Sequence, residues 1–412
     1  MRSTARGHRI RRGMISNRVS YARRCTGTQT SRVGDNMITI TGAYNTAKIF
    51  TDALESSAEG QIQALLDQPF TAGSRIRMLP DVHAGAACVV GTTMTIGDKV
   101  VPNLVGVDIG CGMETVKLTT ARVDLPRLDS FIHDHIPAGM TVRQTPHAYA
   151  DEARLDELVC AKQLNLARGA LSLGTLGGGN HFIEIDRDDE GALYVVVHSG
   201  SRNLGLQVAQ HYQNAAAKAL GRSSEIPPML AYCEGALLAD YLHDMEILQA
   251  YAALNRRAIA DAVLKGGKLK EDFRFSTTHN YIDLAHGILR KGAVSAQAGE
   301  TLLIPINMRD GALICQGLGN PDWNFSAPHG AGRLMSRSEV KQRFTLSAYK
   351  KEMQGVFSTT VNAETLDECP MAYKSMEEIL THIEPTVRVV KQIFPIYNFK
   401  AGETSKRKGV NR

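Results

Sequence analysis

The sequence predicts an α+β fold in a single large domain. From residue 76 to residue 118, short runs rich in β-branched residues and glycine, interrupted by Pro80 and Pro102, indicate strands joined by tight turns. Residues 227–264 instead carry apolar residues at helical spacing, which is typical of one or two long helices. Strands and helices do not alternate regularly, so a doubly wound parallel sheet is not expected.

The other elements follow from local patterns along the chain. Alternating residues at 37–41 predict a strand, and apolar residues at helical spacing predict helices over 44–66 and 151–170. The glycine-rich segment 174–179 suits a turn, because so many glycines destabilise both regular elements. Three further strands are expected at 181–186, 193–198 and 301–316.

The composition favours an ordinary globular protein. The chain has 412 residues, of which 43% are hydrophobic and 22% charged, and it shows no internal repeat and no long interior linker. No stretch approaches the roughly 20 apolar residues of a membrane span, so no membrane partner is expected. The seven cysteines are scattered and lack a CxxC pair, which argues against a disulfide framework and predicts a cytoplasmic protein.

The two ends of the chain differ from the middle. Residues 1–36 contain nine arginines and one acidic residue, Asp35, whereas the whole chain has a net charge of +5, so the remainder is net acidic. Because residues 1–36 also lack apolar periodicity, we expect an unfolded extension. A misassigned start codon explains it better than a transit peptide. We therefore expect one folded domain at 37–400 and a basic tail at 401–412.

Polar side chains flanked by glycine mark the candidate site, because glycine permits sharp turns and close approach of an ion or phosphate. Asp108 and Cys111 lie three residues apart in GVDIGCGM and can point at one centre. A carboxylate, a thiolate and imidazoles together suit a divalent transition metal, and a thiolate can bridge two ions. The alternative is that Cys111 is simply a small buried apolar residue.

Two histidines and one arginine lie in similar settings. His181 in GGGNHFIE and His198 in VHSGSR lie at the edges of predicted strands, where each suits either a metal ligand or a core histidine. The glycines before Asn180 resemble a phosphate cradle, but no P-loop lysine follows them. Arg202, in the same VHSGSR segment, suits either an RNA-phosphate contact or a solvated turn.

His329 stands in a different setting, PHGAGR, without an adjacent Asp, Glu or Cys. Flexible neighbours and the nearby Arg333 favour a nucleophile that reacts with phosphate over a metal ligand. A neutral histidine can form a phosphoramidate in such a reaction.

Taken in order, the motifs DVHAG, GVDIGCGM, LGGGNHFIE, VHSGSR, HNY and HGAGR resemble those of the RtcB RNA ligases, over about residues 77–400. The resemblance implies the family's own α+β architecture, with two manganese ions in a deep pocket. It implies that Asp108, Cys111 and His181 bind one ion, that Cys111, His198 and His279 bind the other, and that Cys111 bridges them.

The resemblance also implies catalytic and nucleotide-binding residues. His329 matches the histidine that accepts GMP from GTP, and Arg202 matches an arginine that holds an RNA phosphate. The implied guanine-nucleotide contacts are Asn180, His181, Phe182, Ile183, Glu184, Asn280, Pro305, Ile306, Asn307, Met308, Ala312, His329, Gly330, Ala331, Gly332, Tyr373 and Lys400.

The implied reaction joins an RNA 3′-phosphate or 2′,3′-cyclic phosphate end to a 5′-hydroxyl end, in RNA repair or tRNA splicing. The implied partners are these RNA ends and an archease-like activator or a release-factor-like protein. Three places depart from the family pattern: Ala86-Ala87-Cys88, where a lysine usually follows DVHAG; Pro305-Ile306-Asn307-Met308, where Pro-Gly-Ser-Met is usual; and Ala312, in place of a serine.

Two other functions use the same residues. A dinuclear metallohydrolase acting on RNA terminal phosphates needs the same Asp, Cys and His cluster, with His329 only binding phosphate. A non-catalytic RNA-binding module is less consistent with the motifs, because burying so many ionisable groups without a metal is costly.

Overall fold

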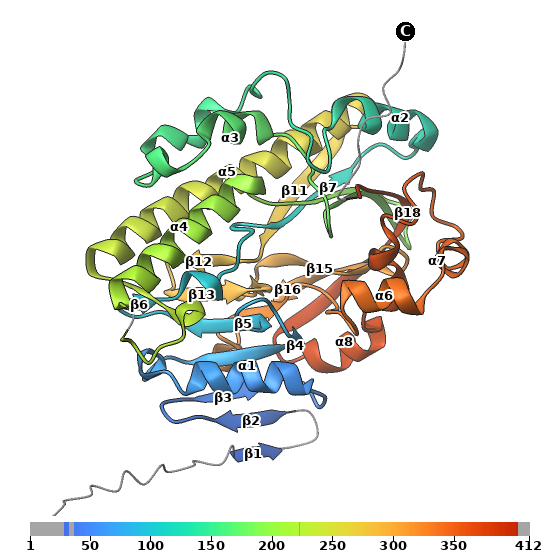
Figure 1. The fold of residues 1–412 in the computed structure, drawn as a ribbon. Coiled ribbons are helices and arrows are strands. Elements are labelled where there is room, and N and C mark those ends of the chain that lie inside the picture. Colours follow the sequence, from blue (N-terminus) through green and yellow to red (C-terminus); the bar gives the residue numbers. More distant parts are fainter. Residues whose placement is uncertain (1–28, 33–36, 222, 403–412) are drawn as a thin grey trace, which may run out of the picture.

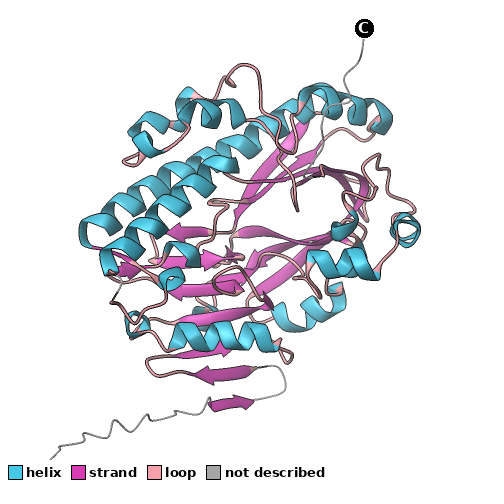
Figure 2. Ribbon diagram, viewed as in Figure 1, coloured by secondary structure: helices cyan, strands magenta, loops and turns pink. Residues whose placement is uncertain are grey.

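The computed structural model describes residues 29–32, 37–221 and 223–402 and has the predicted α+β architecture. Two seven-stranded sheets form its centre, and the helices lie around them (Figures 1 and 2). Two short strand pairs complete the strands: β10 (Cys233–Glu234) with β6 (Lys99–Val100), and β14 (Ala293–Ser295) with β17 (Ser326–Pro328).

The first sheet has the order β1-β2-β3-β4-β5-β13-β12. Neighbouring strands are antiparallel except β3 and β4, which are parallel. The strands are β1 (Gln29–Arg32), β2 (Ile38–Thr41), β3 (Thr46–Ile49), β4 (Ile76–His83), β5 (Val90–Thr95), β12 (Tyr281–Asp283) and β13 (Ile288–Lys291).

The second sheet has the order β11-β7-β9-β8-β18-β16-β15 and is antiparallel throughout. Its last strand in sequence, β18, therefore lies in the interior of the sheet between β8 and β16. The strands are β7 (Gly112–Leu118), β8 (Phe182–Asp188), β9 (Leu193–Ser199), β11 (Glu271–Thr278), β15 (Thr301–Asn307), β16 (Gly311–Gly317) and β18 (Val387–Lys400).

The longest helix, α5 (Gly235–Gly267), packs on β7 and β9 of the second sheet. Its buried residues Ile259 and Val263 share a core with Val195 and Val197 of β9. The other helices are α1 (Ser56–Leu66), α2 (Leu125–His135), α3 (Leu166–Ser172), α4 (Arg202–Leu220), α6 (Arg337–Arg343), α7 (Leu346–Glu352) and α8 (Met376–Ile383). No helix in the described ranges is long and apolar enough to cross a membrane.

Two helix predictions are wrong in part. Only the second half of 44–66 is helical, because residues 46–49 alternate in burial and pair with both β2 and β4, so sheet pairing overrides the helical spacing. Within 151–170 the first part forms three short 3₁₀ turns, at 151–153, 155–157 and 161–163, and the α-helix begins only at Leu166. There the buried Asp244 carboxylate accepts hydrogen bonds from Val159 N and Cys160 N, which holds the backbone out of an α-helix.

Other expectations are met more closely. The strand at 37–41, the strands within 76–118 and the long helix near 235–264 are confirmed, and residues 301–316 form a hairpin of two strands. Within 1–36, Gln29–Arg32 form β1 against β2, so the expectation of an unfolded extension does not hold for these four residues. The rest of 1–36, and residues 403–412 of the expected basic tail, lie outside the described residues.

Candidate metal and nucleotide site

Four neighbouring strands of the second sheet bring five candidate ligands to one edge. Because these strands are antiparallel, the starts of β7 and β8 lie beside the ends of β9 and β11. Gly112 pairs with Thr278 and with Ser199, and Phe182 pairs with His198. The candidate ligands at this edge are Asp108 and Cys111 before β7, His181 before β8, His198 in β9 and His279 after β11.

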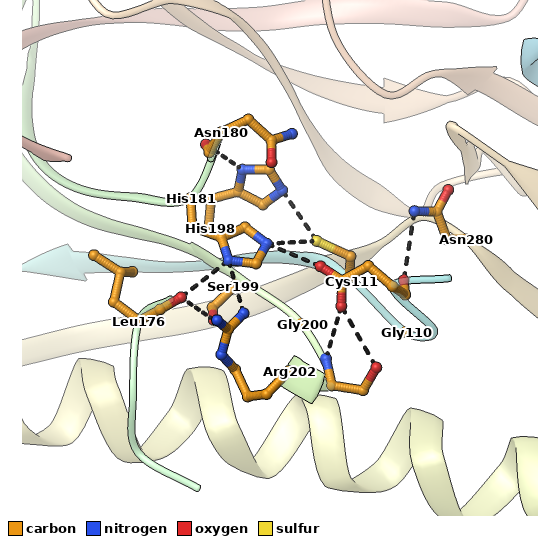
Figure 3. A network of polar contacts seen from close by, with 12 residues as sticks. Gly110, Cys111, Leu176, Asn180, His181, His198, Ser199, Gly200, Arg202 and Asn280 are labelled. Atoms are coloured by element: carbon orange, nitrogen blue, oxygen red, sulfur yellow. Dashed lines mark hydrogen bonds and ion pairs between the residues drawn. The ribbon is translucent and has the colours of Figure 1, made fainter. Parts of the chain in front are cut away.

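The donor atoms form two groups that share Cys111: Asp108, Cys111 and His181 in one, and Cys111, His198 and His279 in the other. Cys111 Sγ lies 3.4 Å from His181 Nε2 and 3.2 Å from His198 Nε2 (Figure 3). His181 Nε2 lies 3.0 Å from Asp108 Oδ2, and His198 Nε2 lies 3.4 Å from His279 Nε2. Within each group the ligand atoms lie within 4.8 Å of one another.

Backbone carbonyls orient two of the histidine rings. His181 Nδ1 lies 2.9 Å from Leu176 O, and His198 Nδ1 lies 3.1 Å from Asn180 O. A carbonyl oxygen only accepts, so the tautomer that satisfies it carries the proton on Nδ1 and leaves the Nε2 lone pair facing Cys111. Metal-bound histidines use this same arrangement.

Burial suppresses charge on three of the candidate ligand side chains. It lowers the pKa of His198 and of His279, and neighbouring histidines add to both effects. Burial also raises the pKa of the Cys111 thiol, to which the charge of Asp108 adds. Neutral imidazoles are the form that binds a metal ion, and a bound cation reverses the effect on the thiol. The donor set therefore fits transition-metal ions.

Residues behind the ligands hold this edge in shape. Ser201 N donates to Asp108 Oδ1 at 3.0 Å. Arg256, fully buried on α5, donates from Nη1 to Gly110 O at 2.6 Å and to Ser199 O at 3.2 Å. One side chain of α5 thus ties the start of β7 to the end of β9, a role that the sequence motifs did not reveal.

His329 lies next to the second ligand group but is held differently. It follows β17, and its ring centroid lies 4.9 Å from that of His279. Its Nδ1 lies 2.6 Å from Oδ2 of Asp81, a fully buried residue of β4. The His329 backbone N–H donates to the same oxygen at 3.1 Å. When Nδ1 carries the proton and donates it in a hydrogen bond to Asp81, the lone pair of the His329 ring is on Nε2.

Glycine is required where the backbone passes this pair. Gly292 and Gly332 both have positive φ, 60° and 75°. A Cβ at Gly292 would lie 3.1 Å from His329 Cε1, and a Cβ at Gly332 would lie 2.7 Å from Asp81 O. Both positions therefore need the small residue for its conformation and for its size.

A cavity of about 430 Å³ connects these groups. It is lined by most of the predicted site residues. The predicted site residues that line it are Asp108, Cys111, Asn180, Phe182, Glu184, His198, His279, Asn280, Pro305, Ile306, Asn307, Met308, His329, Gly330, Ala331, Gly332, Tyr373 and Lys400.

Four predicted site residues do not line the cavity. His181 is one of them, although its Nε2 faces Asp108 and Cys111. Ile183 and Ala312 are buried in hydrophobic core, and Ile183 points to the opposite face of β8 from Phe182 and Glu184. Arg202 is the fourth. Its Nη1 lies 3.0 Å from His181 Nδ1, and a Cβ at Gly177 would collide with its guanidinium.

Arg202 also has an unusual backbone. Its φ is 59° at the start of α4, a left-handed conformation that costs an arginine free energy and marks a constrained position. Its guanidinium and Leu176 O compete for the same nitrogen of His181, because a protonated Nδ1 donates to the carbonyl and cannot accept from Arg202.

Charged residues crowd around Glu368 on another wall of the cavity. Glu368 Oε2 accepts from Lys400 Nζ at 2.8 Å and from Tyr373 OH at 2.7 Å, and its Oε1 pairs with Arg333 and Arg337. Burial opposes ionisation of Glu368, but the three cations outweigh it and hold the pKa of its carboxyl below the usual value.

Glu184 lies in a contrasting environment. It accepts from Asn398 Nδ2 at 2.6 Å, but burial dominates and raises its pKa to about 7. The neighbouring Asp186 is fully buried, and neither of its carboxyl oxygens has a protein hydrogen-bond partner in the described ranges.

Sequence reasoning missed several residues in and behind the cavity wall. Asp81 stands inside the quoted DVHAG motif, yet nothing local links it to a residue 248 positions away. Glu368 and Arg337 lie in segments that look like charged surface. Lys291, which lines the cavity and donates to Cys88 O at 2.9 Å and to Asn103 O at 3.1 Å, had no flanking signal beyond Gly292.

Comparison with known proteins gives a consistent match. A family model described as "tRNA-splicing ligase RtcB" matches residues 61–163 and 156–401. "RNA-splicing ligase RtcB" of Escherichia coli strain K12 and "RNA-splicing ligase RtcB1" of another E. coli strain are each 32% identical over 380 residues, covering 82% of this chain and 92% of the relative. "tRNA-splicing ligase RtcB" of Aeropyrum pernix is 26% identical over 417 residues, covering 77% and 86%.

Proposed function

The chain belongs to the RtcB family of RNA-splicing ligases, and from that premise we propose that it joins RNA ends in a reaction that requires GTP and manganese. The donor strand ends in a 3′-phosphate or 2′,3′-cyclic phosphate, and the second strand begins with a 5′-hydroxyl. The observation that carries the proposal is the position of His329. Its Nδ1 is hydrogen-bonded to the buried Asp81, and its ring lies beside His279, a member of one of the two ligand groups that share Cys111.

Two manganese ions fit the paired ligand groups. Asp108, Cys111 and His181 would hold one, and Cys111, His198 and His279 the other. Such cations neutralise charge that develops on phosphate oxygens and on a leaving pyrophosphate. The protein's own contribution is to position the reacting groups and to exclude water around them.

His329 is the proposed nucleophile. Its Nε2 attacks the α-phosphorus of GTP, an N–P bond forms, and the bond to pyrophosphate breaks. The ring then carries positive charge, which the Asp81 carboxylate stabilises at Nδ1. An oxygen of the RNA 3′-phosphate next attacks the GMP phosphorus, which frees His329 and leaves an RNA 3′-ppG end. The 5′-hydroxyl of the second RNA attacks the phosphorus attached to that 3′ end and releases GMP. A 2′,3′-cyclic phosphate is first hydrolysed to a 3′-phosphate.

The nucleotide is proposed to bind in the cavity, against the residues of the sequence motifs that line it. Asn180, Glu184, Tyr373 and Lys400 face the cavity there with hydrogen-bonding groups. Ile183 and Ala312 can contribute only backbone atoms or packing, because their side chains lie in hydrophobic core.

The physiological setting is proposed on the same basis. We place the reaction in the cytoplasm, in RNA repair or tRNA splicing, with an archease-like activator or a release-factor-like protein as the candidate partner. Addition of such a partner to a purified ligation assay, at matched enzyme concentration, measures whether it is needed.

A labelling experiment tests the reaction. Incubation with manganese and [α-³²P]GTP should leave label on the denatured protein, acid-labile and base-stable as expected of a phosphoramidate. Addition of RNA bearing a 3′-phosphate should remove the label and yield joined product with a 5′-hydroxyl strand. A dinuclear phosphohydrolase would release phosphate from the RNA end without ever retaining label, and that result would refute the ligase assignment.

A further inference from the structure

Two long stretches of the chain contain no acidic residue. Residues 135–150 and 158–183 carry neither Asp nor Glu, although the chain has 42 acidic residues in 412. The same stretches contain Arg143, Lys162 and Arg168. A local excess of arginine without acidic neighbours attracts polyanions.

The fold places these two stretches side by side. Gly139 N donates to Gly177 O at 2.8 Å, and Leu176 N donates to Pro137 O at 2.9 Å. Arg143 N donates to Leu171 O at 3.0 Å. The segment after α2 therefore lies along α3 and along the glycine-rich loop at 174–179, which leads to Asn180 at the cavity wall.

Three arginines lie against this surface. Arg143 Nη1 lies 3.5 Å from the position of a Cβ at Gly174, and Arg202 covers Gly177. Arg168 Nη2 donates to Met140 O at 3.0 Å. In the described ranges none of the three has a carboxylate within ion-pair distance, and the buried Arg143 Nε has no hydrogen-bond partner. Arg154, Arg333 and Arg337, by contrast, are all paired with Glu or Asp.

The glycine-rich loop adds backbone donors. Gly177 and Gly179 have φ of 84° and 70°. Gly177 forms an isolated bridge with Ala138, and in the part of the chain that the structure describes no protein acceptor is recorded for the successive backbone N–H groups of residues 178–180. Consecutive free N–H groups in such a loop form a concave anion site, and Arg337 Nη2 lies 3.9 Å from the position of a Cβ at Gly179.

We propose that Arg143, Arg168 and the loop at 177–180 form a surface that binds the phosphodiester backbone of single-stranded RNA outside the cavity. The strand's terminal phosphate would lie in the cavity, and the preceding phosphates would follow the loop and the two arginines. This surface is separate from the proposed nucleotide site, since neither Arg143 nor Arg168 lines the cavity. The inference rests on the proposed ligase function and names the part of the RNA that this surface holds.

Donor length provides the test. Arg143→Gln, Arg168→Gln and the double variant are compared with wild type in ligation of donors that end in a 3′-phosphate and have either 2 or 12 nucleotides. Each single variant should lower kcat/KM for the 12-nucleotide donor about tenfold, the effect of one charge-assisted hydrogen bond. Ligation of the 2-nucleotide donor and formation of the enzyme–GMP adduct should be unchanged.

Direct binding gives a second measurement. Fluorescence anisotropy with the 12-nucleotide RNA should show weaker binding, and the slope of log K against log salt should shrink by about 0.7 for each phosphate of the single strand that the variant no longer neutralises. Arg143→Lys should restore part of the affinity, because the charge remains. Arg187→Gln is the matched control, since Arg187 is exposed on β8, has no carboxylate partner in the described ranges and lies at the far end of that strand from His181.

The outcomes separate the two proposals. Equal losses with short and long donors, or the same loss in Arg187→Gln, would overturn the RNA surface. Absence of the GMP adduct in wild type would overturn the ligase function, while anisotropy would still report whether the surface binds RNA.

Discussion

The proposed ligand histidines and His329 lie close together, yet their Nδ1 atoms have different hydrogen-bond partners. His181 and His198 face neutral backbone carbonyls at 2.9 and 3.1 Å. His329 faces the Asp81 carboxylate at 2.6 Å. A carbonyl fixes the tautomer and the direction of the ring, which is what a ligand requires. A carboxylate also stabilises positive charge, which the His329 ring would develop when its Nε2 bonds to phosphorus.

The partner of Nδ1 therefore separates the proposed ligands His181 and His198 from the proposed nucleophile His329, while Nδ1 of His279 has no hydrogen-bond partner among the described residues.

Cys111→Ala should abolish both metal binding and ligation, because Cys111 is common to the two ligand groups. Elemental analysis of purified protein measures the metal content. Cys88→Ala is the control, since Cys88 is equally buried but belongs to neither group. A Cys111→Ala protein that still holds two ions would contradict the bridging assignment.

His329→Ala should retain both ions and yet form no GMP adduct. It should still seal RNA that already carries a 3′-ppG end, because that step requires positioned phosphates and no nucleophilic histidine. Gel assays with GTP and with the activated RNA separate the two steps. If mass spectrometry maps an adduct to another residue, Lys400 being the first to examine, the comparison of histidines loses its basis.

Asp81→Asn should slow guanylylation about a hundredfold or more, the range for loss of a group that assists proton placement or charge in the transition state. The substitution keeps the shape and a hydrogen bond to His329 but removes the negative charge. Single-turnover kinetics of label transfer measure the rate. Unchanged guanylylation at full metal content would show that the carboxylate only packs against the ring.

Arg202→Lys should slow transfer to RNA moderately while guanylylation survives, because lysine keeps the charge but loses the planar fork. Because Arg202 also contacts His181 Nδ1, the alternative is that it orients this proposed metal ligand. If metal affinity and both half-reactions fall together, Arg202 acts through His181 rather than on RNA.

The carboxyls of Glu184 and Glu368 extend the comparison to pH. Burial raises the pKa of Glu184 to about 7 from 4.5, so between these values the folded protein holds a proton that the unfolded chain has released. Stability should fall as pH rises through this window and level off above it. Thermal unfolding at several pH values should show the decline, and Glu184→Gln should reduce it. Glu368, whose pKa is lowered, has the opposite sign, and its contribution is lost only in acid.

The sequence predicted this molecule well where the signal is local. Asp108, Cys111 and His181 each stand beside glycines in short motifs, and the fold brings them together with His198 and His279. Long-range pairing had no such signal. Asp81, the hydrogen-bond partner of His329, is 248 residues away from it. Glu368 lies in a charged segment, and its place in the site is evident only from its ion pairs with Arg337 and Lys400.

The errors in secondary structure have the same origin. Residues 46–49 have helical spacing, but strand partners on both sides decide their conformation. Residues 151–170 have an amphipathic pattern, but Asp244, far along the chain on α5, captures the backbone N–H groups of Val159 and Cys160. Local propensity loses in both places to a contact that no sequence window contains.

The interior position of β18 has a consequence for biosynthesis. This strand is the last to leave the ribosome, yet it separates β8 from β16 within the second sheet. A chain that stops short of residue 387 leaves both neighbours as open strand edges, which recruit other chains. Premature termination should therefore yield aggregation or proteolysis rather than a partial enzyme that consumes GTP without joining RNA.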